Sequence, residues 1–122
     1  MFEITHEEFT GIGSSDPADL LPLLRSENPQ GIRRIARLRL TVLLKSFGES
    51  EKLRWADILF SRLRNSADSW EQRNIIEVLS TFAEVEVDNK LMQIIDLPHI
   101  DPHARERALC LLRPSYAKFS LK

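Results

Sequence analysis

The sequence predicts an all-α fold, arranged as a right-handed stack of about three antiparallel helix hairpins with about seven helices. One observation is a recurring motif in which an arginine is followed three residues later by a small or aliphatic residue. Its copies are Arg33-x-x-Ala36, Arg73-x-x-Ile76 and Arg105-x-x-Ala108. The arginines lie 40 and then 32 residues apart, in or near the range of two-helix repeat units. The other observation is that helical periodicity dominates, since the best strand candidate, Val85-Glu86-Val87, has only three residues.

The first part of the chain is expected to hold a cap helix and a loop within residues 1–15, followed by two further helices. Asp16, which precedes a proline, is a strong helix start, because a capping carboxylate is followed by proline at the first helical position. Pro22 should kink this helix slightly. A long helix is expected over about 32–47, ended by Gly48.

The long helix over 32–47 carries apolar residues on more than one stripe, which predicts that it packs between neighbours on both sides. These apolar residues are Ile32, Ile35, Ala36, Leu38, Leu40, Val42, Leu43, Leu44 and Phe47. A third helix is expected over about 50–64, with Trp55 in the core. A fourth helix is expected to begin at a cap formed by Ser69.

The last part of the chain is expected to hold a short helix that stops before Pro98 and a final helix that starts at Asp101-Pro102. Residues 16–113 would then form three helix pairs, and 114–122 would be a tail. The whole chain, 1–122, is expected to be a single domain, long enough to bury a core without disulfides.

The composition is that of a soluble globular protein, with 43% apolar and 29% charged residues among 122. Cys110 has no second cysteine to pair with, so nothing points to an oxidising compartment. The N-terminus is acidic and lacks the basic-then-apolar order of a signal peptide. No apolar run approaches the roughly 20 residues of a membrane span. We therefore expect a cytoplasmic protein without a membrane partner.

The repeated pattern resembles HEAT-type repeats, including the short variety found in phycobilin-lyase-like repeat proteins. The resemblance covers residues 16–113. It is carried by Leu20-Leu21-Pro22-Leu23-Leu24, Asn28-Pro29 and Arg33-x-x-Ala36, and again by Asp101-Pro102-x-x-Arg105-x-x-Ala108-x-x-x-Leu112. The middle copy departs from it, with Ser69 for the turn's aspartate, Trp70 for proline and Ile76 for the small residue. The resemblance implies a HEAT-like α-solenoid used as a binding scaffold, in which Arg33, Arg73 and Arg105 brace adjacent units.

Charge is strongly segregated along the chain, although the net charge is only −1. Residues 1–24 carry five acids and no bases, and residues 25–64 carry ten bases against four acids. Residues 65–101 carry eight acids and two bases, and residues 102–122 carry five bases and one acid. The blocks of −5, +6, −6 and +4 are explained either by internal pairing between neighbouring layers or by a polar partner.

Catalysis and metal binding have little support in the sequence. His99 and His103 are four residues apart, but Pro98 and Pro102 bracket His99, so the two histidines straddle a turn and a helix start. Cys110 lies within an apolar helix and is expected to be a small buried hydrophobe, not a nucleophile. We expect no catalytic residues, no metal ligands and no cofactor.

Nucleic-acid binding is an alternative function for the basic block 25–64. Phosphate neutralisation needs several basic side chains on one face, and this block offers Arg33, Arg34, Arg37, Arg62 and Arg64. Acidic blocks flank it on either side, the isoelectric point is near 6.3, and few aromatic residues are available to stack on bases.

The function predicted from the sequence is therefore a non-catalytic protein-interaction module that docks one face on a partner protein. Its most specific form is an immunity-type inhibitor that neutralises a cognate toxin, since polarised charge can steer association. Trp70, at a turn beside arginines, is the kind of residue that anchors interfaces. The expected contact residues are Arg34, Arg37, Arg62, Arg64, Trp70, Glu71 and Glu77. An enzyme would need a cleft, for example one lined by Arg73 and Glu77, and a monomer or weak dimer is expected.

Overall fold

The computed structural model describes residues 16–81 and 85–111, and within them the chain is all-helical, with no strand. The elements are α2 (Pro17–Leu20), the 3-10 helix η1 (Leu21–Leu24), α3 (Gln30–Ser46), α4 (Glu49–Asn65), α5 (Ser69–Leu79), α6 (Val85–Ile95) and α7 (Pro102–Leu111). The described residues thus hold six α-helices, not about seven. The expected cap helix within 1–15 and the tail 114–122 lie outside the described residues.

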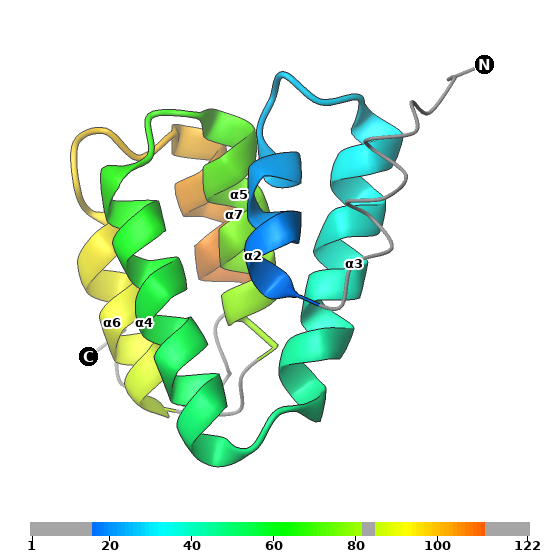
Figure 1. The fold of residues 1–122 in the computed structure, drawn as a ribbon. Coiled ribbons are helices and arrows are strands. Elements are labelled where there is room, and N and C mark those ends of the chain that lie inside the picture. Colours follow the sequence, from blue (N-terminus) through cyan, green and yellow to red (C-terminus); the bar gives the residue numbers. More distant parts are fainter. Residues whose placement is uncertain (1–15, 82–84, 112–122) are drawn as a thin grey trace.

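The helices form two layers (Figure 1). One layer holds α3, α5 and α7 side by side, all running in the same direction. The other layer holds α2 with η1, then α4, then α6. Each member of the first layer packs against the element that precedes it in the chain, so that η1 contacts α3, α4 contacts α5 and α6 contacts α7. Helix α5 is central, because it contacts α3, α4, α7 and η1.

The first helix begins as expected but does not continue through Pro22. Asp16 caps α2, since its Oδ1 accepts a hydrogen bond of 3.0 Å from the backbone N–H of Ala18. Beyond Leu20 the chain tightens into the 3-10 helix η1. Proline lacks a backbone N–H and its ring crowds the preceding turn, so a regular α-helix ends here instead of bending.

Gly48 does not end the long helix, although the sequence predicted that it does. Helix α3 stops at Ser46, and Gly48 instead precedes α4 with a φ of −70°, which any residue can adopt. No described glycine has a positive φ. A left-handed glycine cap is therefore not what separates α3 from α4.

The core lies between the two layers and includes side chains from every described helix. Its fully buried large residues are Leu20, Leu24, Ile32, Leu40, Leu44, Leu59, Leu63, Ile75, Ile76, Leu79, Leu91 and Ile95. Trp55 is buried as expected, with 7% of its surface exposed. None of the helices among the described residues is both long enough and apolar enough to cross a membrane.

The expectation that α3 is packed on both sides is wrong for the described part of the chain. Ile35, Leu38 and Val42 are exposed by 43%, 50% and 65% of their surface. Helix α3 lies at the end of its layer and has only α5 beside it there, so a second apolar stripe has no described neighbour to cover it.

Candidate partner-binding face

The first helical turns of α3, α5 and α7 are equivalent, and their backbone hydrogen bonds fix the register. The N–H of Arg33 donates to the carbonyl of Pro29, and the N–H of Arg105 donates to that of Asp101, both at 3.0 Å. In α5 the corresponding bond joins Gln72 to Asp68, also at 3.0 Å. Gln72 rather than Arg73 therefore occupies the position of the repeated arginine, and the motif expected from the sequence is one residue out of register in the middle copy.

The register differs because α5 begins at a different cap from the one expected. Asp68, not Ser69, caps the helix, since its Oδ1 accepts a hydrogen bond of 2.9 Å from the N–H of Glu71. Asp68 also joins the turn before α5 to the turn before α3. Its carboxylate accepts hydrogen bonds from the backbone N–H and the hydroxyl of Ser26, the latter at 2.7 Å.

Arg33 and Arg105 hold the turns that precede their own helices. Nη1 of Arg33 donates to the carbonyl of Asn28 at 2.6 Å. Nε and Nη2 of Arg105 donate to the carbonyls of Ile95 and Leu97, at 2.6 and 3.2 Å. Both arginines thus satisfy carbonyl groups of the chain that leads into their own helix, a structural role.

Gln72 takes this role in the middle copy, and it also bonds to the turn that precedes α7. Its Nε2 donates to the carbonyls of Ser66 and His99, at 2.8 and 3.1 Å. Its Oε1 accepts from the backbone N–H of Asp101 at 2.7 Å. Because Gln72 is buried, these bonds tie the turn before α5 to the turn before α7.

Arg73 is consequently displaced onto the one stripe of α5 that its neighbours leave half-exposed. This stripe consists of Trp70, Arg73 and Glu77, which are three and then four residues apart. The guanidinium of Arg73 lies 4.3 Å from the centre of the Trp70 ring, and the guanidinium of Arg33 lies 4.5 Å from it. Among the described residues, the ring is the contact that Arg73 makes, and its N–H groups have no acceptor there.

Glu77, one turn further along α5, is satisfied internally. It pairs with Arg37 of α3 at 3.6 Å and with Arg107 of α7 through a hydrogen bond from Nε. The hydrogen bond and the charge of Glu77 raise the pKa of Arg107. This carboxylate thus ties the three helices of one layer together.

Glu71 forms a second internal pair on the side of α5 that faces the other layer. It is buried, and it accepts from Arg25 at 3.2 Å and from Arg62 of α4 at 2.8 Å. Internal pairing therefore accounts for part of the alternation of charge along the chain. Of the expected contact residues, Arg37, Arg62, Glu71 and Glu77 are engaged in these pairs.

The remaining expected residues lie on both layers. Arg34 is exposed on α3, and Trp70 is half-exposed on α5. Arg64 is exposed near the end of α4, in the other layer, so the structure does not bring it together with Arg34. We call the following set the α3–α5–α7 face: Arg33, Arg34, Arg37, Trp70, Arg73, Glu77, Glu106 and Arg107.

Sequence reasoning assigned Arg73 a bracing role and left Glu106 and Arg107 out of the candidate site. One signal could have placed Arg73. Asp101 precedes Arg105 by four residues, and Asp68 precedes Gln72 by the same spacing. Aligning the middle copy on its aspartate would have moved Arg73 to the outward position.

Asp68 makes stability depend on pH. Although burial raises its pKa, hydrogen bonds from the hydroxyl and N–H of Ser26 and the N–H of Glu71, with the charge of Arg25, lower the pKa overall below 3.8. The carboxylate therefore stabilises the fold above about pH 4 and loses this effect as pH falls through the lowered pKa. We expect Asp68→Asn to lower the free energy of unfolding by about 1 kcal/mol at pH 7.

The measurement is urea unfolding of wild type and Asp68→Asn at neutral and strongly acidic pH. The difference between the two proteins should shrink at acidic pH, where wild-type Asp68 is protonated too. Asp96→Asn is the matched control, because Asp96 is exposed and has no ion-pair partner among the described residues. A pH-independent difference would contradict the assignment.

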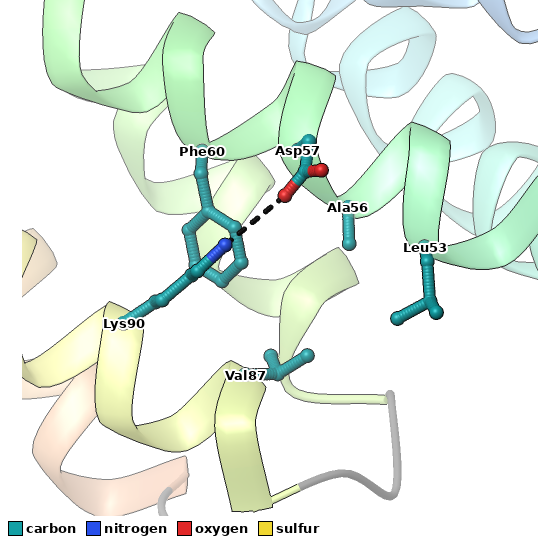
Figure 2. Close-up of a pocket in the computed structure, with 6 residues that line it drawn as sticks. All are labelled: Leu53, Ala56, Asp57, Phe60, Val87 and Lys90. Atoms are coloured by element: carbon teal, nitrogen blue, oxygen red, sulfur yellow. Dashed lines mark hydrogen bonds and ion pairs between the residues drawn. The ribbon is translucent and has the colours of Figure 1, made fainter.

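A shallow groove of about 210 Å³ lies between α4 and α6, in the other layer (Figure 2). Buried Ala56, Phe60 and Val87 line it. Lys90 of α6 bridges to Asp57 of α4 at 3.1 Å and lies over the Phe60 ring. The groove has room for an apolar side chain, and its titratable groups pair with each other, so it offers no arrangement for acid–base or nucleophilic chemistry.

Metal and thiol chemistry are no better supported by the described residues. They contain no group of three or more His, Cys, Asp or Glu residues that could hold a metal ion. Cys110 is exposed, which corrects the expectation that it is a small core residue. Helix α7 buries Ala104 and Ala108 instead, and Cys110 lies off that stripe.

Comparison with known proteins gives no match: no protein-family model, no curated protein and no solved structure is significantly similar to this chain.

Proposed function

We propose that this protein is a non-catalytic interaction module, built as a HEAT-like α-solenoid, that docks its α3–α5–α7 face on a partner protein. The observation that carries the proposal is the displacement of Arg73. Gln72 holds the turns in its place, which leaves Arg73 beside Trp70 on a stripe that the neighbouring helices cover only in part.

Tryptophan and arginine are the residue types that most often dominate the binding energy of protein interfaces. Trp70 offers a large half-exposed ring, and Arg73 offers donors without acceptors among the described residues. Stacking on the ring also restricts the Arg73 side chain before a partner arrives. Less conformational entropy is then lost on binding.

The narrower form of the proposal is an immunity-type inhibitor of a cognate toxin. Five arginines and two glutamates on one face support this form, because such a field can steer association with a partner of opposite charge.

Nucleic-acid binding through the block 25–64 has weaker support. Apart from Arg25, its arginines are divided between α3 and α4, in different layers, and Arg25, Arg37 and Arg62 are paired with glutamates. The observation in its favour is that Arg33 and Arg73 lie close together, both over the Trp70 ring.

Trp70→Ala should weaken binding to the partner about 30-fold, equivalent to about 2 kcal/mol, because it removes the anchor and the support of Arg73. The partner is first retained from lysate of the source cells at high salt, with nuclease added. Dissociation constants are then measured by calorimetry for wild type, Trp70→Ala and Arg73→Ala.

Arg64→Ala is the matched control, since Arg64 is an exposed arginine on the opposite layer. It should change the dissociation constant less than twofold, within the range of a screened surface charge. Equal affinities of wild type, Trp70→Ala and Arg73→Ala would overturn the proposal. Retention of nucleic acid alone, lost on nuclease treatment, would do so as well.

A further inference from the structure

The helices α3, α5 and α7 present equivalent positions in a row, because they run in the same direction and begin at equivalent residues. The position five residues after Pro29, Asp68 and Asp101 is occupied by Arg34, Arg73 and Glu106 (29 + 5, 68 + 5 and 101 + 5). Arg34 and Glu106 are exposed and Arg73 is half-exposed. Among the described residues, none of the three has an ion-pair partner.

One turn further along α5, Glu77 differs because it pairs with Arg37 and Arg107, which occupy other positions in the register of their own helices. Arg33 donates to carbonyl groups, and Arg37, Glu77 and Arg107 form ion pairs, so Arg34, Arg73 and Glu106 are the charged residues of the α3–α5–α7 face without an ion pair or side-chain hydrogen bond among the described residues. The charge order of the Arg34–Arg73–Glu106 row is positive, positive, negative from α3 to α7. Trp70 lies one turn before Arg73 and gives this row an apolar neighbour.

We infer that the partner places two acidic groups over Arg34 and Arg73 and a basic group over Glu106, so that charge order fixes the direction of docking. This inference rests on the proposed function. Neighbouring packed helices lie roughly 8–10 Å apart, so the two acids need a similar separation. A segment in the polyproline II conformation with charged residues at every third position meets it, since that conformation has three residues per turn and rises about 3.1 Å per residue.

A nucleic acid fits this row less well than an acidic protein segment. Its phosphates would continue over α7, where Glu106 is exposed and would repel them. The charge of a protein segment can change from negative to positive at this point.

The test uses the whole protein and two heptapeptides of identical composition, with glycine at the uncharged positions. One has glutamate at positions 1 and 4 and lysine at position 7. Its isomer has lysine at position 4 and glutamate at positions 1 and 7. Binding is followed by NMR through the side-chain Nε–H signals of Arg34 and Arg73, and decathymidylate is titrated in parallel.

Wild type should bind the first peptide about threefold more tightly than its isomer, since solvent screens exposed ion pairs and each adds little to affinity. Glu106→Arg and Arg73→Glu should each abolish this preference, because either change leaves both peptides with two matched charges and one opposed charge. Arg64→Glu is the charge control and should leave the preference unchanged.

Equal binding of the two peptides, or the absence of shifts at Arg34 and Arg73, would overturn the inference. Tighter binding of decathymidylate than of either peptide would also overturn it. If Trp70→Ala still weakens capture of the protein partner while the peptides bind equally, the docking face stands and only the charge order is wrong. If Trp70→Ala has no effect on capture either, the proposed function fails as well.

Discussion

Replacing Gln72 with methionine is expected to lower the free energy of unfolding by about 3 kcal/mol. Methionine matches glutamine in length but cannot bond to the carbonyls of Ser66 and His99 or to the N–H of Asp101. Gln72 is 1% exposed, so water has little access to the groups left without partners. Urea unfolding monitored by circular dichroism would measure the loss.

Gln93→Met is the matched control, because Gln93 is exposed on α6. It should change the unfolding free energy by less than about 0.5 kcal/mol. A small loss for Gln72→Met, similar to that of the control, would show that this side chain does not hold the turn before α5 to the turn before α7. Gln72 would then occupy the same position as Arg33 and Arg105 without contributing to the free energy of unfolding.

Much of the fold could be predicted from local signals. The helical periodicity excluded a sheet, and Asp16 and Asp101 each cap a helix that starts with proline, as expected. These signals act within one helical turn, so the sequence of a few residues determines them. The end of the long helix was predicted to within about a residue, but the role of Gly48 was not, because a glycine between two helices can end one or begin the next and only the backbone angle distinguishes these roles.

The candidate site could be predicted only in part, because its geometry depends on long-range contacts. The charge blocks left open which arginines pair within the molecule. Two of these arginines, Arg25 and Arg62, donate to Glu71, which lies 46 and nine residues away from them in the sequence. Trp70 was expected to be partly exposed at a turn, and it is. Its contact with Arg33 depends on the packing of α3 against α5, which no local pattern encodes.

Leu40→Ala should lower the free energy of unfolding by about 3 kcal/mol, because Leu40 has no exposed surface and its truncation leaves a cavity between the layers. Leu38→Ala, on the same helix, should cost less than about 1 kcal/mol, since half of the Leu38 surface is exposed. The two variants remove the same atoms and differ little in helix propensity, so the difference in their urea-unfolding free energies reports burial alone.

The pair of leucines also tests why the sequence overestimated the packing of α3. Two apolar stripes on one helix are typical of a helix between neighbours, yet α3 ends its layer and its second stripe faces outward. Equal losses of about 3 kcal/mol for both variants would mean that the Leu38 side is covered in solution. The expectation of packing on both sides would then be restored. A loss confined to Leu40→Ala would establish Ile35, Leu38 and Val42 as an apolar surface that the two layers leave open, which would lower solubility unless another surface covers it.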